Sequence, residues 1–416
     1  MSEPIPRVGG PSPTGSRPRV AIVFQRFGPY HISRLEAAAR HLAVIGIELS
    51  ATDRTYAWAS TKDSGGFRRI VVSPDIDAEP IARMAAKVAR TLSDARPDAV
   101  AIAGWSHPAA LAALLWCSWK GIPTVLMSDS AADDAVRRSW REGVKRRIVS
   151  LFASAVVGGA PHRPYLVGLG MPSDAIFDGL DVVDNDHFEK GAARVRADAD
   201  AHRARHALPA RYFLTSSRMI GKKNLFAILD AYRIYRADAG AQAWDLVMLG
   251  DGRLMPSIRD AIACAGLTQH VHLPGFRQYD ELPIYYGLAG AFVLASTTEQ
   301  WGLVVNEAMA AGLPVLVSTR CGCSTDLVRP GINGFTFEAA DPKQLAQFMR
   351  IVASDPEIAA SMAAAGQDLI AAWSPARFAD HLLSAVERAQ ATRRRAGLVA
   401  LGVTGLSLFR RERPDD

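Results

Sequence analysis

The chain has 416 residues, of which 49% are hydrophobic and 22% charged, which is the composition of a folded globular protein rather than a disordered one. This length is too great for one ordinary hydrophobic core and favours two domains. Lys and Arg total 48 against 42 Asp and Glu, and this small surplus excludes a chain dedicated to nucleic acid but suits an anionic small ligand or membrane surface. The four cysteines form no CxxC pair or zinc-ligand spacing, so we expect reduced thiols in a cytoplasmic protein.

Short apolar runs dominate the first half of the chain. Residues 1–18 are rich in Gly, Pro and Ser and lack an apolar core, so we expect a flexible leader there and no targeting signal. Continuous β-branched runs then predict strands buried on both faces of a parallel sheet. These runs lie at 19–24, 46–51, 68–73, 98–104, 123–128 and 154–159. Stretches with helical apolar spacing separate them, which predicts an N-terminal Rossmann-like domain over residues 19–185.

The same alternation returns in the second half. Residues 186–209 are polar and carry no strand-like run, so we expect a linker there. Apolar runs follow at 211–217, 243–249, 270–275, 290–296, 313–318 and 333–337. They predict a second Rossmann-like domain over residues 210–375, which faces the first across a ligand-binding cleft.

The C-terminal segment, residues 376–416, is expected to form a helix and a basic, apolar tail. The apolar run from 396 to 409 has arginines on both sides and is shorter than the roughly 20 residues that span a bilayer. It either lies in a membrane interface or packs as a helix on the domains.

The most informative stretch is 296–319, STTEQWGLVVNEAMAAGLPVLVST, where a polar turn joins an apolar strand to a helix. Glu299 lies in the turn, and Glu307 lies about one turn into a helix that begins near Gly302 or Leu303. Both carboxylates can face the cleft, where Glu307 suits a ribose diol and Glu299 a sugar. The helix N-terminus offers N–H groups to an anion, and Gly302 permits close approach. Spacing alone also allows a loop charge and a carboxylate placed by the helix dipole.

A second strand–loop–helix arrangement is found at 216–232, SSRMIGKKNLFAILDAY, with a helix that begins near Asn224. Arg218 and Lys223 project from its loop. A planar guanidinium together with a mobile ammonium group suits a diphosphate without a metal. Alternatively, both are solvated loop cations.

These residues resemble the retaining GT-B glycosyltransferases of family 4, from about Arg211 to Pro356. The resemblance includes the spacing of the two cations, LGDGRL at 249–254, LPGF at 273–276, the two glutamates followed by AMAAGLPVL, and PGINGFTF at 330–337. It implies an α/β fold of GT-B type, with two facing Rossmann-like domains and an interdomain cleft.

The resemblance also implies a role for each donor-side residue. Arg218 and Lys223 would hold the donor diphosphate, Glu307 the ribose hydroxyls and Glu299 the transferred sugar, so that Glu299, Arg218 and Lys223 form the catalytic set. The remaining donor contacts would be Gly28, Phe276, Arg277, Gly302 and Leu303, with Phe276 and Arg277 framing the base.

The N-terminal half offers acceptor-side candidates. The stretch FGPYHISRL at 27–35 enters a helix, so Gly28 can approach the donor phosphates, while Tyr30 and His31 face the acceptor or only cap and pack the helix. Members of this family often have a His at the end of a later strand, where PTVLMSDS places Asp129 instead. His107 ends the preceding strand and is a further candidate, although a polar residue there is more often a helix cap.

The implied reaction is sugar transfer with retention at the anomeric carbon. The donor is a nucleoside-diphosphate sugar, and we expect no cofactor, no metal and no assigned protein nucleophile. Basic residues cluster on an expected helix where family acceptors bind, namely Arg137, Arg138, Arg141, Lys145, Arg146 and Arg147. They suit anionic lipid headgroups or an acidic glycan, or form a solvated helix face. We therefore expect a glycan or lipid-linked acceptor in polysaccharide or cell-envelope synthesis, possible peripheral contact with an anionic membrane at its inner face, and no nucleic-acid partner.

Two other classes of function stay open. One is an epimerase or phosphorylase on the same scaffold, although a pyridoxal-phosphate phosphorylase needs a much longer chain. The other is a non-catalytic sugar-nucleotide-binding protein. A NAD-dependent dehydrogenase is disfavoured, because no GxGxxG follows an early strand.

Overall fold

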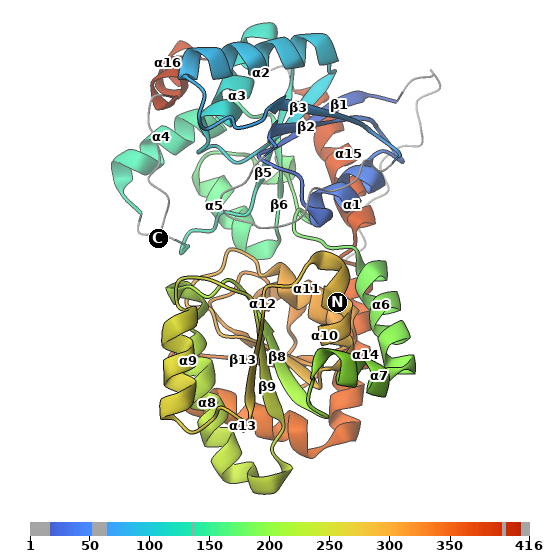
Figure 1. Cartoon of the computed structure of the whole chain (residues 1–416). Helices are drawn as coiled ribbons and strands as arrows, with labels where there is room; N and C mark the ends of the chain where they lie inside the picture. Colours follow the sequence, from blue (N-terminus) through green and yellow to red (C-terminus); the bar gives the residue numbers. More distant parts are fainter. Residues whose placement is uncertain (1–16, 52–64, 135–136, 393–396, 409–416) are drawn as a thin grey trace.

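The structure is a computed structural model that describes residues 17–51, 65–134, 137–392 and 397–408. It contains two α/β domains stacked one above the other (Figure 1). Most of the expected leader, residues 1–16, lies outside the described residues. The predicted α/β class with two parallel sheets is confirmed.

The N-terminal domain has a seven-stranded parallel sheet in the order β3-β2-β1-β4-β5-β6-β7. Its strands are β1 (Arg19–Phe24), β2 (Ala43–Ser50), β3 (Arg68–Ser73), β4 (Ala99–Ala103), β5 (Thr124–Ser128), β6 (Ser154–Val157) and β7 (Ile176–Phe177). The helices between them are α1 (Pro29–Ala38), α2 (Ile81–Ala95), α3 (Pro108–Lys120), α4 (Ser139–Val149) and α5 (Arg163–Gly168). Strands β4, β5 and β6 are almost wholly buried, as their continuous apolar sequences require.

The C-terminal domain has a six-stranded parallel sheet in the order β10-β9-β8-β11-β12-β13. Its strands are β8 (Tyr212–Ser216), β9 (Asp245–Leu249), β10 (Val271–Gly275), β11 (Ala291–Leu294), β12 (Val315–Ser318) and β13 (Gly334–Phe337). Its helices are α8 (Leu225–Ala239), α9 (Met255–Cys264), α10 (Leu282–Leu288), α11 (Leu303–Ala310), α12 (Ser324–Leu327), α13 (Pro342–Ser354) and α14 (Pro356–Ala371).

The segment expected as a linker, residues 186–209, is mostly helical. It contains nearly all of α6 (Asn185–Ala197) and the whole of α7 (Ala199–His206). The Asp184 carboxylate caps α6 by accepting from the His187 N–H at 3.2 Å. One side of α6 is buried and packs against α10 and α11, so this helix belongs structurally to the C-terminal domain.

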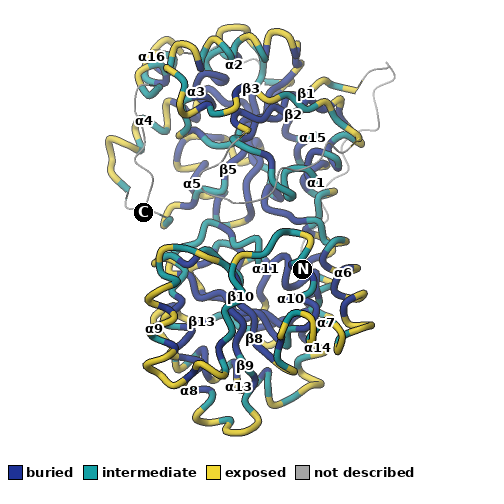
Figure 2. The backbone as a smooth tube through the Cα atoms, viewed as in Figure 1, coloured by how far each residue is buried: buried dark blue, intermediate teal, exposed yellow. Residues whose placement is uncertain are grey.

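Two helices at the end of the chain return to the N-terminal domain. Helix α15 (Pro375–Ala391) packs against α1 and β6, and the Ser154 hydroxyl donates to the Ala385 carbonyl at 2.6 Å. Helix α16 (Leu398–Ser407) packs against α3 and α4. Figure 2 shows dark-blue buried backbone running through both domains, and one apolar cluster joins them, with Leu35, Val305 and Phe378 among its members. The chain therefore crosses between the domains twice, on the side of the molecule where α6 and α15 lie (Figure 1).

Candidate functional site

The carboxyl ends of both sheets meet between the domains, and the loops that follow these strands touch across the boundary. The contacts are Tyr30 to Glu307, His162 to Gln300 (3.0 Å), Ala160 to Asp326 (2.8 Å) and Arg320 to Asp133 (3.4 Å). In parallel α/β sheets the carboxyl edge is where ligands bind. This boundary is therefore the candidate functional site.

Glu307 is fully buried within α11, which begins immediately after Gly302. Gly302 has φ 110°, a left-handed conformation that favours glycine and turns the chain sharply into the helix. One carboxylate oxygen of Glu307 accepts from the Tyr30 hydroxyl and the other from the Tyr286 hydroxyl, the latter at 2.6 Å. Burial raises the pKa of Glu307 to about 7, and the two hydrogen bonds only partly oppose this rise.

Glu299 lies in the loop after β11, as its sequence position predicts. Its carboxylate forms an ion pair with Lys223 and accepts from the Ser296 hydroxyl at 3.1 Å. The side chains of Lys223 and Glu299 are only 12% and 15% exposed. The structure therefore brings these two predicted residues together, although they lie in different loops.

The loop that carries Lys223 is held by its neighbour Asn224. Asn224 has φ 55°, and its side-chain amide donates to the carbonyls of Ala295 (3.1 Å) and Ala339 (2.8 Å). These bonds fasten the loop to the end of β11. Arg218 lies half-buried in the same connection, after β8, where the Met219 N–H donates to the Asp251 carbonyl at 2.8 Å. The turn at 250–252 thus supports the segment of the two cations.

Phe276 and Arg277 follow β10 at the same edge of the sheet. The Phe276 ring is 37% exposed. The Arg277 guanidinium donates to the Pro274 carbonyl at 3.0 Å, contacts Glu281 at 3.4 Å and lies over the Tyr285 ring. Phe276 is thus partly exposed, whereas Arg277 is held against α10. Leu303, the first residue of α11, is half-buried beside Gly302.

The acceptor-side candidate His31 and the expected donor contact Gly28 both lie at the start of α1. The Gly28 N–H donates to the His31 imidazole at 3.0 Å, and this ring packs edge-on against Phe24 with centroids 4.5 Å apart. Burial, with Arg34 nearby, lowers the pKa of His31 to about 3. His31 is therefore neutral and serves the start of its own helix.

His107 has two partners within the N-terminal domain. Its Nδ1 accepts from the Ala109 N–H at 3.1 Å, which makes it the N-cap of α3, and its Nε2 contacts Asp77 at 2.8 Å. The structure therefore gives His107 the capping geometry that the sequence offered as an alternative, and does not bring it to the two glutamates.

Asp129 follows β5 at the carboxyl edge of the N-terminal sheet. Burial raises its pKa, while His162 opposes that rise. Burial and the Asp129 carboxylate also raise the pKa of Asp181, whose side chain lies 3.8 Å from Arg34. Two carboxyl groups whose pKa is raised therefore lie near a guanidinium at this edge of the sheet. Groups of this kind can hold or release a proton closer to neutral pH than an ordinary carboxyl group does.

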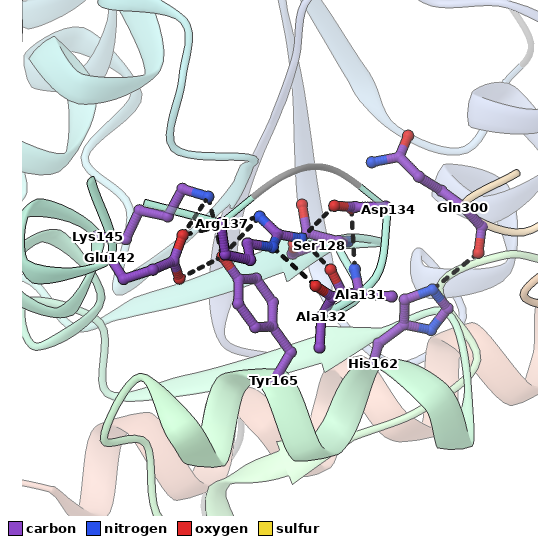
Figure 3. A network of polar contacts seen from close by, with 11 residues as sticks. Ser128, Ala131, Ala132, Asp134, Arg137, Glu142, Lys145, His162, Tyr165 and Gln300 are labelled. Carbon is purple, nitrogen blue, oxygen red and sulfur yellow. Dashed lines mark hydrogen bonds and ion pairs between the residues drawn. The ribbon is translucent and has the colours of Figure 1, made fainter. Parts of the chain in front are cut away.

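A buried network across the domain boundary was not predicted from the sequence. The Asn306 side chain accepts from the Trp301 indole at 2.9 Å and donates to the Asp181 carbonyl at 3.2 Å. The buried His162 contacts the Gln300 carbonyl at 3.0 Å (Figure 3). The only sequence signal was the Gly-Gly pair before this histidine. A Cβ on Gly159 would lie 2.2 Å from Asp326 and 2.7 Å from Trp301, so the domains approach closely here.

The basic cluster expected on one helix is divided in the structure. Arg137, just before α4, donates to the Ala132 carbonyl at 2.9 Å and also pairs with Asp134 (Figure 3). Lys145 contacts Glu142 at 3.1 Å and the Tyr165 hydroxyl at 2.9 Å. Arg138, Arg141, Arg146 and Arg147 are exposed. Only this second group is open to an anionic partner.

Metal and membrane features were searched within the described ranges. There, no group of three or more His, Cys, Asp or Glu side chains could hold a metal ion. The helices of the same ranges include none that is both long and apolar enough to cross a membrane.

Comparison with known proteins identifies the C-terminal domain. Residues 198–369 match the family model described as glycosyl transferases group 1. The matched residues contain the loops of Arg218, Lys223 and Glu299 and the helix of Glu307. The match thus covers the part of the chain that carries the two glutamates.

Individual relatives agree with this assignment. The amylovoran biosynthesis glycosyltransferase AmsK of Erwinia amylovora is 30% identical over 142 residues, covering 33% of this chain and 34% of that protein. A GDP-mannose-dependent α-(1-6)-phosphatidylinositol monomannoside mannosyltransferase of Mycobacterium tuberculosis is 28% identical over 213 residues, covering 48% and 54%. The chain thus spans between a third and about half of the length of these relatives.

The likeness to solved structures extends over both domains. Anabaena HepE, in a complex with UDP and glucose, superposes with a TM-score of 0.67 at 15% identity, covering 88% of this chain and 98% of that one. At this identity the likeness shows the fold alone, and it confirms the GT-B architecture.

Proposed function

We propose that this chain, whose C-terminal domain matches the group 1 glycosyl transferases, is a retaining glycosyltransferase of family 4 that uses a nucleoside-diphosphate sugar. Two observations carry the proposal: Lys223 forms an ion pair with Glu299 in the loops after β8 and β11, and Glu307, in the helix after β11, contacts Tyr30 of the second domain. A cation for phosphate and two carboxylates for hydroxyl groups are the chemistry that such a donor requires.

In the proposed site, each group binds one part of the donor. Arg218 and Lys223, with the N–H groups around Gly302 and Leu303, hold the diphosphate. Glu307 accepts from the ribose hydroxyls, and Phe276 and Arg277 lie beside the base. Glu299 accepts from hydroxyls of the sugar. Its ion pair with Lys223 supports this arrangement, because the bond between sugar and diphosphate would then lie beside both side chains.

The proposed reaction breaks the bond between the anomeric carbon and the diphosphate oxygen, and forms a bond from the same carbon to an acceptor hydroxyl oxygen. Negative charge grows on the departing diphosphate, where Arg218 and Lys223 stabilise it. The acceptor hydroxyl loses a proton, and Asp129 is an acceptor-side candidate to receive it, as a buried carboxyl group of raised pKa. No cofactor or metal is needed in this proposal, because the two cations and the helix N-terminus offset the diphosphate charge.

The named relatives support the proposed substrates. HepE is seen with UDP and glucose, and the mycobacterial relative uses GDP-mannose on a phosphatidylinositol mannoside. AmsK is a glycosyltransferase of amylovoran biosynthesis. By analogy we propose a glycan or lipid-linked acceptor, a place in polysaccharide or cell-envelope glycan biosynthesis, and a cytoplasmic protein that works at the inner face of the membrane.

The test is calorimetric binding of UDP and GDP to the parent and to Arg218→Ala, Lys223→Ala and Lys222→Ala. Each of the first two should lose about 1.5–3 kcal/mol of binding free energy, since each removes a charge-assisted contact. Lys222 is exposed in the same loop and serves as the matched control, which should bind as the parent does. Unchanged binding in both alanine variants would reject the assignment.

A donor screen with added acceptor extracts completes the test. Release of nucleoside diphosphate that increases with acceptor supports transfer. Binding without any sugar release or conversion would instead favour a non-catalytic sugar-nucleotide-binding protein, and conversion of the free donor to another sugar nucleotide would favour an epimerase.

A further inference from the structure

Helix α16 is an apolar helix on the outer side of the N-terminal domain, away from the boundary between the domains (Figure 1). Ala400 and Thr404 are buried where it packs against α3 and α4. Three of its apolar residues are exposed, with Leu398 at 87%, Val399 at 64% and Leu406 at 73% exposure. A surface helix of a globular protein ordinarily turns charged or polar side chains toward water. This outward apolar face therefore calls for a partner.

The two helices beneath α16 add exposed aromatic residues. Trp119, in the last turn of α3, is 75% exposed, and the Lys120 ammonium lies 4.2 Å from its ring centroid. Trp140, at the start of α4, is 50% exposed, with the Arg141 guanidinium over its ring. Tryptophan paired with a flanking cation is the combination that favours a membrane–water interface, where the ring meets the headgroup region and the charge meets phosphate.

The exposed positive charge of α4 indicates which kind of partner fits this surface. Arg138, Arg141, Arg146 and Arg147 are exposed, whereas Arg137 and Lys145 are engaged by Asp134 and Glu142. Exposed arginines beside an apolar helix complement a surface that is both negatively charged and apolar beneath. A bilayer with anionic headgroups has both properties.

We propose that the outer face of α16, together with Trp119, Trp140 and the exposed arginines of α4, is a docking surface for an anionic lipid bilayer. We name it the α16 surface. The helix lies along the interface and does not cross it, since its ten residues are about half of a spanning length. The inference deepens the proposed work at the inner face of the membrane, on which it rests, by naming the residues that make the contact.

The experiment is flotation of the full chain with phosphatidylcholine vesicles, with and without phosphatidylglycerol. The parent should float with the anionic vesicles and be released as salt rises, because surface attraction decays over about a Debye length. Leu398→Gln combined with Leu406→Gln should weaken this binding at least tenfold. Both side chains are largely exposed, so the change should leave the fold intact. The matched control is Ile332→Gln with Ile358→Gln, which removes exposed apolar residues from the C-terminal domain and should float as the parent does.

Three outcomes would overturn the proposal that the α16 surface docks on a bilayer. A parent that stays in solution with anionic vesicles at low salt, or a Leu398/Leu406 variant that floats as well as the parent, overturns the proposal. So does a parent that is dimeric by light scattering, becomes monomeric in that variant and ignores vesicles, because the partner is then a second copy. Nucleoside-diphosphate affinity, measured on the same samples, should equal the parent's in both variants. Its absence from the parent would reject the proposed function without touching the vesicle result.

Discussion

The Tyr30 hydroxyl of the N-terminal domain donates a hydrogen bond to the carboxylate of Glu307 in the C-terminal domain. Tyr286 occupies the other oxygen of that carboxylate at 2.6 Å, and Glu307 is fully buried. If Glu307 binds the donor ribose as proposed, a side chain that now covers its carboxylate must first move, because Glu307 is fully buried. Tyr30 is the one that belongs to the opposite domain, so donor entry requires α1 to move away from α11.

Tyr30→Phe should therefore tighten the binding of free UDP or GDP. The lost hydrogen bond, worth about 0.5–1.5 kcal/mol, competes with the ribose, so affinity should rise roughly twofold to tenfold. Calorimetry on the parent and variant measures this. Tyr286→Phe is the control, since it touches the same carboxylate from within the C-terminal domain and should not improve affinity. Weaker binding in Tyr30→Phe would show instead that Tyr30 helps to hold the nucleotide.

The pKa of Glu307 predicts a pH dependence of stability. Burial raises this pKa from 4.5 to about 7, so the native state binds more protons than the unfolded state between these values. The resulting stabilisation is complete below about pH 4.5 and is lost as pH rises through about 7, and it amounts to roughly 3 kcal/mol at most. Urea unfolding at several pH values should show that the free energy of unfolding of Glu307→Gln lacks this decrease. Parallel pH profiles for parent and variant would contradict the assignment.

The two glutamates should differ in the ligand that they affect. Glu307→Gln should weaken the binding of free nucleoside diphosphate, because the proposed ribose contact is present even when the nucleotide carries no transferable sugar. Glu299→Gln should leave the binding of the free nucleotide unchanged and weaken the binding of the nucleotide sugar. We expect this even though the change also releases Lys223 from its ion pair. Paired titrations of UDP and UDP-glucose, or of GDP and GDP-mannose, measure the difference. Equal losses for both ligands in both variants would remove the distinction.

The sheets could be predicted from the sequence because parallel strands that are buried on both faces consist of continuous apolar runs. The run at 19–24 became β1 with the same bounds, whereas β7 (Ile176–Phe177) is too short to leave a pattern. The helices at 186–209 were hidden by their charged composition. Only a narrow set of buried residues, including Phe188, Ala192 and Val195, marks the side of α6 that packs on its domain.

In the site, strand–loop–helix patterns placed Glu299 and Glu307 in the right loop and helix, because local chain geometry decides both positions. One partner of Glu307, however, depends on how the two domains meet. The contact of Tyr30 with Glu307 joins residues 277 positions apart, and no local pattern encodes it. His162 was overlooked for the same reason, since its partner is a backbone carbonyl of the other domain.

Donor binding and turnover should survive EDTA. The diphosphate charge is proposed to be offset by Arg218, Lys223 and backbone N–H groups, so chelation should leave the rate of nucleotide release within about twofold of the untreated enzyme. An assay with a matched donor, with and without chelator, measures this. Loss of activity that returns with magnesium or manganese would mean that a metal stabilises the leaving group.

Asn306 should couple the domain boundary to the sugar-binding loop. Its side chain is fully buried and satisfies both the Trp301 indole and the Asp181 carbonyl, and Trp301 lies two residues after Glu299. Asn306→Leu keeps the volume but leaves one donor and one acceptor unpaired, so it should destabilise the protein by about 2–4 kcal/mol. Urea unfolding measures this loss. Displacement of Trp301 should also weaken the binding of the nucleotide sugar more than the binding of the free nucleotide.

Asn333→Leu separates this coupling from simple loss of stability. Asn333 is equally buried, accepting from the Arg329 N–H at 2.8 Å and donating to the Leu327 carbonyl at 2.7 Å, but all its partners lie in one turn of the C-terminal domain. It should therefore cost similar stability and leave the ratio of nucleotide-sugar to nucleotide affinity unchanged. If both variants shift that ratio alike, Asn306 acts only on the fold. If Asn306→Leu alone shifts it, the boundary network positions the loop that carries Glu299.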